Sequence, residues 1–432
     1  MRILDWNSST IAQQCEALRR PALNDAAGVD AAVRGIIGRV RREGDAALLA
    51  LTRQYDGVQL AALAVTKQEF AAAEGALTSD QHGAIDRAID NVRRFHAAQA
   101  TAPLRVETAP GVICERFSVP IRAVGLYVPA GSAPLPSTAI MLAVPAALAQ
   151  CPVRLMCTAP NSAGNANPAV LVAARKAGVE QIFKVGGAQA IAAMAFGTES
   201  VAKCDKIFGP GNAYVTAAKM LAAQDAGGAA LDLPAGVTEV MVIADEEARP
   251  EFVAADLLAQ AEHSPEAQAI LVTTQTALAT AVIGEVQRQS ASLSRSRILA
   301  QSIAAMRLIV VDSLQTAFDI ANTYAPEHLI LEIREARSWL PEIRAAGAVF
   351  LGHWSPESLG DYCSGPNHTL PTYGYARSYS GLSLEDFQRR ITVQELTPAG
   401  LKGLGPTANI LAGLEGLDAH AAAVSIRLEA LR

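Results

Sequence analysis

The chain has 432 residues, half of them hydrophobic, and a formal net charge of −6, so it is long enough for two or three domains of about 100 to 200 residues. No apolar run reaches the roughly 20 residues that cross a bilayer, the first ten residues lack the apolar region of a signal peptide, and six cysteines without a CxxC pair exclude a disulfide framework. Because an acidic chain without basic blocks cannot neutralise many phosphates, we expect a cytoplasmic globular protein with neither a membrane nor a nucleic acid as its partner.

The first hundred residues are predicted to be mainly helical. Residues 1–23 are expected to form a short N-terminal helical segment, and from Asp25 to about Ala100 the apolar residues recur at helical spacing. A Pro-rich stretch from Thr101 to Pro110 then marks a change of pattern.

Beyond this stretch, short apolar runs alternate with Ala-rich helical segments. Each run is followed by Gly or Pro and then by a helix pattern, which is typical of βαβ units in a parallel sheet. The runs fall into two sets, at 123–128, 153–158, 181–185, 206–208 and 240–244, and at 269–273, 307–311, 329–333 and 348–351. The sequence therefore predicts an α/β protein with two parallel-sheet domains.

The C-terminal tail, residues 383–432, follows the last of these runs. Its pattern predicts one strand at 391–396 and two helices. Such a tail is too short to make a core of its own and must pack on something else, which could be a second subunit.

Four residues are candidates for holding a metal ion. The segment 249–265 reads as an amphipathic helix on which Gln260 and His263 are three apart, so that an amide oxygen and an imidazole could reach one zinc ion. The same spacing also fits a surface glutamine beside a capping histidine. Asp361 and His420 lie outside the regular α/β repeat, where functional residues often occur, although His420 also fits a histidine on a helix surface.

Glu327 and His328 are candidates for proton transfer, since they directly precede an apolar run. A histidine titrates near neutrality and a partly desolvated glutamate can take a proton from water, so the pair could supply two different bases. The two residues equally fit a polar lead-in to a strand.

Two glycine turns could bind a nucleotide, although no GxGxxG follows any predicted strand. Residues 184–190 and 208–214 each read as a strand end, a glycine turn and a helix start. Backbone amides and the helix dipole at such a turn favour a pyrophosphate. Glycine turns are common in α/β proteins, so the turns alone leave nucleotide binding open.

Over nearly its whole length the chain resembles the histidinol dehydrogenase family. The stretches that carry the resemblance, in the family's order, are GLYVPAGSAPLPST at 125–138, VGGAQAI at 185–191, FGPGN at 208–212, DLPAG at 232–236, LAQAEH at 258–263, PEHL at 326–329 and NHTLPT at 367–372.

The resemblance implies a zinc-dependent, NAD-linked, four-electron oxidation of L-histidinol through L-histidinal to L-histidine, in histidine biosynthesis. It implies that Gln260, His263 and Asp361 bind one zinc ion per subunit, and that His420 completes the site from the partner subunit of an intertwined homodimer with exchanged tails. The implied catalytic pair is Glu327 and His328. The implied NAD contacts are Tyr127, Gln189 and Asn212, and the implied substrate contacts are Thr238, His368 and Glu415 together with the four metal ligands and His328.

We expect two Rossmann-like domains to carry these residues. The first, formed by 24–126 and 238–382, would hold the metal and catalytic residues, and the second, 127–237, would bind NAD. The helical segment 1–23 and the tail 383–432 complete the predicted division.

The chain departs from the family pattern at Ala130, at Val237-Thr238 and at Ser264-Pro265, but none of these changes removes an implied ligand or base. Three alternatives stay open: a cysteine nucleophile at Cys363 in a route through a thiohemiacetal, another small polar diol or amino alcohol as substrate, and a metal-dependent hydrolase or binding module without NAD. The ligand types also suit manganese or cobalt, and the sequence does not separate NAD from NADP.

Overall fold

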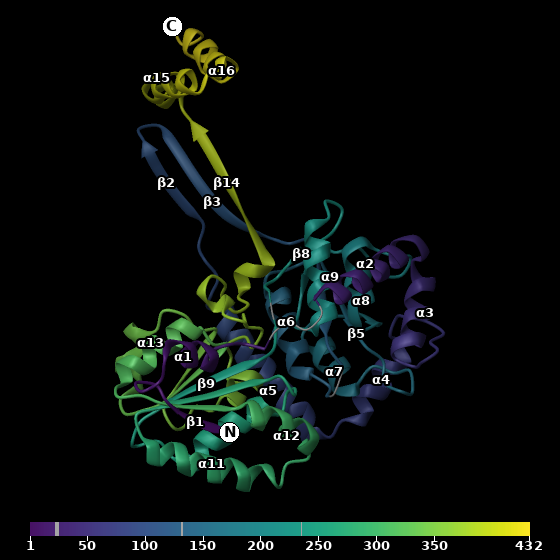
Figure 1. Ribbon diagram of the computed structural model, residues 1–432. Helices are drawn as coiled ribbons and strands as arrows, with labels where there is room; N and C mark the ends of the chain where they lie inside the picture. Colours follow the sequence, from purple (N-terminus) through teal and green to yellow (C-terminus); the bar gives the residue numbers. More distant parts are fainter. Residues whose placement is uncertain (22–25, 131–132, 235) are drawn as a thin grey trace.

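Two parallel sheets form the body of the protein in the computed structural model (Figure 1). The structure describes residues 1–21, 26–130, 133–234 and 236–432. The predicted domain boundary at 23/24, positions 131 and 132 of the first resembling stretch and position 235 of the fourth lie outside the described residues. The predicted α/β fold class is confirmed.

The larger sheet has six parallel strands in the order β1-β11-β10-β9-β12-β13. Its strands are β1 (Arg2–Asp5), β9 (Glu239–Ala244), β10 (Gln268–Thr273), β11 (Arg307–Val310), β12 (His328–Glu332) and β13 (Ala348–Leu351). The central strands β9, β10 and β12 are buried along their whole length, which explains their continuous apolar runs.

Helices cover both faces of this sheet. One face packs against α10 (Pro250–Ala261), α11 (Thr276–Ser290) and α12 (Ser296–Ala305). The other face packs against α1 (Ile11–Ala17), α13 (Leu314–Tyr324) and the 3-10 helix η1 (Ala336–Glu342). Along β9 the side chains alternate, with Val240 and Val242 in the first layer and Met241 and Ile243 in the second.

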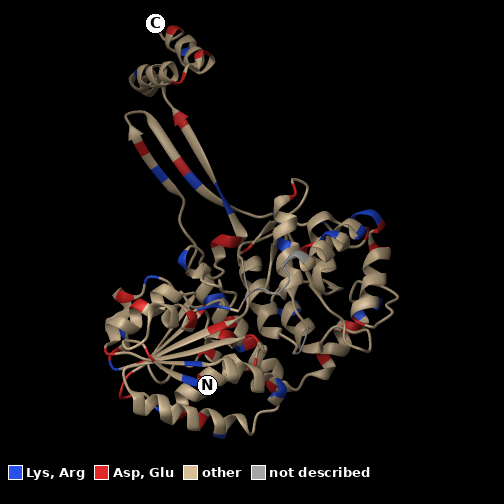
Figure 2. Ribbon diagram, in the orientation of Figure 1, with Lys and Arg blue, Asp and Glu red and all other residues tan. Residues whose placement is uncertain are grey.

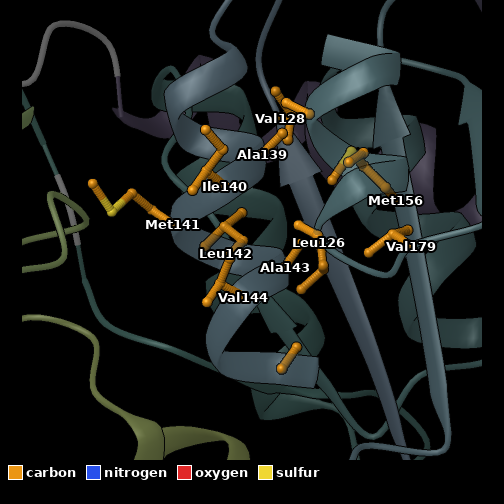
Figure 3. Packing of buried hydrophobic residues seen from close by; sticks show 14 of the residues in the cluster. Leu126, Val128, Ala139, Ile140, Met141, Leu142, Ala143, Val144, Met156 and Val179 are labelled. Atoms are coloured by element: carbon orange, nitrogen blue, oxygen red, sulfur yellow. The ribbon is translucent and has the colours of Figure 1, made fainter. Parts of the chain in front are cut away.

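The smaller sheet has five parallel strands in the order β6-β5-β4-β7-β8. Its strands are β4 (Ala123–Val128), β5 (Val153–Thr158), β6 (Gln181–Lys184), β7 (Lys206–Phe208) and β8 (Ala230–Leu231). One face packs against α4 (Lys67–Ala76), α5 (Ser79–Ala97), α6 (Pro136–Leu148) and α7 (Pro168–Lys176), and the other against α2 (Ala26–Glu43), α3 (Asp45–Tyr55), α8 (Gly187–Phe196) and α9 (Ala213–Gln224). Figure 3 shows Leu126 and Val128 of β4 beside Ala139 and Ala143 of α6.

The packing differs from the predicted division at two places, and from the predicted grouping of the apolar runs at a third. Helices α2 to α5 and strand β4 belong to the five-stranded sheet, although we predicted that 24–126 joins 238–382. The strand at 239–244, predicted with the first set, lies in the middle of the six-stranded sheet, and part of the predicted helical segment 1–23 is the edge strand β1. Helical spacing and apolar runs show that a face is buried, but not which sheet buries it.

A three-stranded antiparallel arm projects from the body and carries the tail (Figure 1). It consists of β2 (Leu104–Ala109), β3 (Val112–Pro120) and β14 (Gln388–Leu396), and it leads to α15 (Pro398–Glu415) and α16 (Asp418–Glu429). No apolar run marks β2 and β3 in the sequence, because β2 is almost wholly exposed and β3 is exposed or half-buried along nearly all of its length. Figure 2 shows basic and acidic residues interspersed along this arm.

Three short segments complete the chain: α14 (Glu357–Tyr362), η2 (Tyr375–Arg377) and η3 (Leu384–Phe387). Within the described ranges, no helix is both long enough and apolar enough to cross a membrane.

Candidate active site

The candidate catalytic residues meet where the neighbouring strands β9 and β12 begin. His328 pairs in register with Val240, so Thr238 and Glu239, at the start of β9, lie beside Glu327 and His328, at the start of β12. The parallel pairing of these strands therefore brings together residues that are almost 90 positions apart in the sequence.

The backbone of Glu239 holds both candidate bases. Its N–H donates to Oε2 of Glu327 at 2.9 Å, and its carbonyl accepts from Nδ1 of His328 at 3.2 Å. The hydroxyl of Thr238 also donates to Oε2 of Glu327, at 2.6 Å. Because a carbonyl only accepts, Nδ1 of His328 carries a proton, and Nε2 is the nitrogen left to exchange one. Nε2 is buried and has no hydrogen-bond partner among the described residues.

Burial and charge shift both bases strongly. Burial raises the pKa of Glu327 to about 7, although His328, the Thr238 hydroxyl and the Glu239 N–H act to lower it. Burial lowers the pKa of His328, but the carboxyls of Glu357, Glu327 and Asp361 outweigh it and raise that pKa to about 10. A glutamate with a pKa near neutrality can accept or release a proton under physiological conditions.

A buried cluster of carboxylates surrounds His328. Its Nδ1 lies 3.5 Å from Oε1 of Glu357, and its Nε2 lies 3.6 Å from Oδ1 of Asp361. One potential ligand atom from each of these three residues lies within 4.8 Å of the others, an arrangement that could hold a metal ion. Glu357 is only 1% exposed, and uncompensated negative charge at such depth is unfavourable.

Of the four predicted metal ligands, Gln260 and Asp361 lie at this cluster. Gln260 is fully buried on α10, with its amide against Thr238, and one orientation of that amide donates to Oε1 of Glu357 at 2.6 Å. Burial raises the pKa of Asp361, but its interactions with His328, His368 and His263 outweigh this effect and lower it.

His263 lies beyond the end of α10, which stops at Ala261 rather than continuing to Pro265 as predicted. The imidazole is exposed, and its Nδ1 lies 3.1 Å from the carbonyl oxygen of Ala259. That carbonyl must accept from Nδ1, so Nε2 is left with a free lone pair, as in a metal-binding histidine.

A cavity of about 400 Å³ connects this cluster to the five-stranded sheet. From the six-stranded side it is lined by Thr238, Glu327, His328, His263 and Asp361, and His368 also borders it. From the other side it is lined by the glycine turn Gly209–Asn212, which follows β7. Predicted catalytic, metal and substrate residues thus share one cavity with a predicted nucleotide turn.

The predicted NAD contacts are only partly brought together. Asn212 lines the cavity and caps α9, with its side-chain oxygen accepting from the backbone N–H of Tyr214 and of Val215. Tyr127 and Gln189 are buried and do not line that cavity. The hydroxyl of Tyr127 accepts from the Gly187 N–H at 2.9 Å, so Tyr127 contacts the other glycine turn.

The structure does not bring Glu415 and His420 to the cavity of their own chain. Both are exposed and lie on the projecting tail, at the end of α15 and in the first turn of α16 (Figure 1). Cys363 is partly buried against apolar residues and does not line the cavity.

Two acidic residues at the site, Glu357 and Glu239, were not predicted from the sequence. Glu357 lies four residues before Asp361, a spacing that places both carboxylates on one face of α14, so the pair could have been recognised. Glu239 acts at the site through its backbone, and its carboxylate pairs with Arg20; no sequence pattern marks such a role.

Comparison with known proteins identifies the family of the chain. A family model for histidinol dehydrogenase matches residues 18–428. The chain is 55% identical over 428 residues to a histidinol dehydrogenase of Xanthomonas axonopodis pv. citri, covering 99% of both chains, and 51% identical over 431 residues to one of Aliivibrio fischeri, covering 100% of this chain and 97% of that one. The crystal structure of histidinol dehydrogenase from Elizabethkingia anophelis matches with a TM-score of 0.95 and 44% identity, over 100% of this chain and 98% of the other. The chain belongs to the histidinol dehydrogenase family of oxidoreductases.

Proposed function

We propose that the protein oxidises L-histidinol through L-histidinal to L-histidine, with zinc and NAD, in histidine biosynthesis. The observation that carries the proposal is the single cavity that Glu327, His328, His263 and Asp361 share with the Gly209–Asn212 turn. The names of the relatives favour histidinol over another diol or amino alcohol.

The donor set fits a divalent cation. Glu327, Glu357 and Asp361 place three carboxyls around one imidazole, and a cation beside them would offset their charge. We assign Gln260, His263 and Asp361 as the zinc ligands of this chain, with His420 of the partner subunit as the fourth. When bound, zinc would act chiefly as a template that orients the substrate.

His328 is the base for the alcohol in this proposal. Its Nδ1–H is engaged by the Glu239 carbonyl, so Nε2 takes the hydroxyl proton as the carbinol hydrogen departs with its electron pair. The surrounding carboxylates hold the imidazole protonated, and a cation beside them would lower its pKa toward the range that a base requires. NAD, when bound, accepts one such hydrogen with its electron pair in each of the two oxidations.

Glu327 serves the second oxidation. Its carboxylate takes a proton from a water molecule as the water oxygen adds to the aldehyde carbon, and the former carbonyl oxygen becomes the alkoxide of the hydrate. The two hydrogen bonds from Thr238 and the Glu239 N–H fix that carboxylate, and burial keeps its pKa near neutrality. Both side chains are thus held in place by the paired strands β9 and β12.

Binding of the substrate and NAD is assigned to both sheets. We propose that Thr238 and His368, with Glu415 of the partner subunit, contact the substrate, and that Tyr127, Gln189 and Asn212 contact NAD. The six-stranded sheet would then carry the metal and catalytic residues, and the five-stranded sheet would carry NAD.

We infer that the tail is exchanged in a homodimer. The tail leaves several apolar side chains exposed, including Ile410 at 66%, Leu414 at 79% and Ile426 at 65%. A projecting helix pair with such a surface needs a partner to cover it, and exchange would carry Glu415 and His420 to the neighbouring cavity.

The proposal is tested by following NADH formation from L-histidinol before chelation, after chelation and after zinc is returned. We expect loss and recovery of activity and two NADH per histidinol. One NADH per histidinol with release of free aldehyde would contradict the two-step assignment.

A further inference from the structure

A buried ion pair lies directly beneath the glycine turn of the cavity and has no part in the chemistry proposed above. Lys219 is on α9 and is 6% exposed, and the side chain of Asp232 is fully buried. They form an ion pair, and both line the cavity with Gly209 and Asn212. Asp232 belongs to the DLPAG stretch, to which no role has been assigned.

The pair binds both backbone groups of Gly209. Nζ of Lys219 donates to the Gly209 carbonyl at 2.9 Å, and Oδ2 of Asp232 accepts from the Gly209 N–H at 2.8 Å. The ion pair between Nζ of Lys219 and Oδ1 of Asp232 links the two side chains, so that they and the Gly209 backbone form a closed ring of interactions. Oδ1 also accepts from the Leu233 N–H at 2.7 Å, which ties Asp232 to its own segment.

Gly209 needs such support because of its conformation. Its φ is +124°, and a Cβ at this position would lie 2.1 Å from the carbonyl oxygen of Tyr127. A glycine is therefore required, and a glycine has the greatest conformational freedom of any residue. Without outside contacts, the Gly209–Asn212 turn would sample many conformations in place of one.

We propose that Lys219 and Asp232 are positioning residues for the coenzyme: their ion pair holds the Gly209–Asn212 turn in the one conformation that receives NAD. The inference rests on the proposed function, because it takes NAD as the ligand of this turn. The ion pair neutralises the charge of Lys219 and satisfies the groups it bonds, so its contribution lies in a fixed backbone rather than in a direct charge on the phosphates. Loss of the pair should weaken NAD binding and leave histidinol binding unchanged.

The test measures the equilibrium Kd for NAD by titration calorimetry, without histidinol, on wild type, Lys219→Met, Asp232→Asn and the double variant. Val201→Ala is the control, because Val201 is a fully buried core residue of the same half of the protein that does not line the cavity. Unfolding midpoints are recorded for every variant. KM for histidinol is measured at saturating NAD.

We expect Kd for NAD to rise at least tenfold in both single variants and to be unchanged in Val201→Ala, with KM for histidinol within twofold of wild type. The double variant should regain much of the unfolding midpoint lost by Lys219→Met, since no unpaired charge is left buried, but its Kd should stay raised because Gly209 has lost the Lys219 bond.

Three results would overturn the inference: an unchanged Kd despite a lowered midpoint, an equal rise in KM for histidinol, or a Kd in the double variant that recovers together with stability. If Lys219→Met does not fold, the Kd for NAD of the nearly isosteric variant Asp232→Asn tests the inference by itself. Failure of wild type to bind NAD would instead refute the proposed function.

Discussion

Arg20 is predicted to compensate a buried charge at the centre of the site. Its guanidinium pairs with both carboxylate oxygens of Glu239, one of them at 2.8 Å, and stacks 3.8 Å from the ring centre of Tyr324. Glu239 is fully buried. Burial raises the pKa of Glu239 above its ordinary value of 4.5, and Arg20 is the main group that lowers it.

The change Arg20→Met should therefore raise the pKa of Glu239 further, so that the folded variant keeps a proton that the unfolded chain releases. Stability is then lost as pH rises, at about 1.4 kcal/mol per unit. At pH 7.5, three pH units above the ordinary pKa of 4.5, keeping Glu239 protonated in the folded variant lowers the free energy of unfolding by about 4 kcal/mol. This value lies within the range of about 3 to 5 kcal/mol for breaking a buried pair. Between pH 5.5 and 7.5 the stability gap to wild type should widen by about 1 to 3 kcal/mol.

The assay is urea unfolding of wild type, Arg20→Met and Arg20→Met/Glu239→Gln at pH 5.5 and 7.5. The double variant has no titrating group at position 239, so its gap to wild type should change less with pH than that of Arg20→Met. A stability gap for Arg20→Met that is the same at both pH values would show that Arg20 acts through packing and not through the charge of Glu239, because lost packing alone does not depend on pH.

Three further predictions concern catalysis and assembly. Glu327→Gln should slow the oxidation of L-histidinal at least ten times more than it slows the oxidation of L-histidinol, measured by stopped-flow NADH formation. Equal slowing of both oxidations would show that Glu327 has no specific role in the second one. Cys363→Ser should keep turnover within twofold, since Cys363 does not line the cavity, whereas loss of turnover would revive the cysteine nucleophile. Leu414→Glu should place a charge on the exposed apolar face of α15 and shift the dimer toward monomers with little activity, measured by light scattering and the histidinol assay. A variant that stays dimeric but is inactive would show that the tail serves catalysis separately from assembly. A fully active monomer would contradict tail exchange.

Much of the fold could be predicted because most strands of the body are buried. The strands at 123–128, 153–158, 206–208 and 348–351 have the predicted bounds, since parallel strands covered by helices read as apolar runs. The arm strands β2 and β3 lack this signal because β2 is almost wholly exposed and β3 is mostly half-buried or exposed. Which sheet receives helices α2 to α5 depends on contacts between distant segments, which helical spacing does not encode.

Several residues of the candidate site could be named from the sequence, but Glu357, Glu239 and the way the site assembles were not predicted. Its residues were assigned from the family resemblance, whereas the hydrogen bonds of Thr238 and the Glu239 backbone to Glu327 follow from the pairing of β9 with β12. The hydrogen bonds of Lys219 and Asp232 to Gly209 likewise form only because α9 and the segment after β8 converge. The contributions of Glu415 and His420 stay predictions, because they depend on a second chain.

We propose that turnover at this cavity requires one divalent ion, held by Gln260, His263 and Asp361. Elemental analysis combined with the histidinol assay on wild type and His263→Ala tests it most directly. We predict about one zinc per wild-type subunit, and in the variant a loss of zinc together with at least a hundredfold loss of turnover. Active wild-type enzyme without stoichiometric metal, or full turnover in His263→Ala, would show that the reaction does not need this ion.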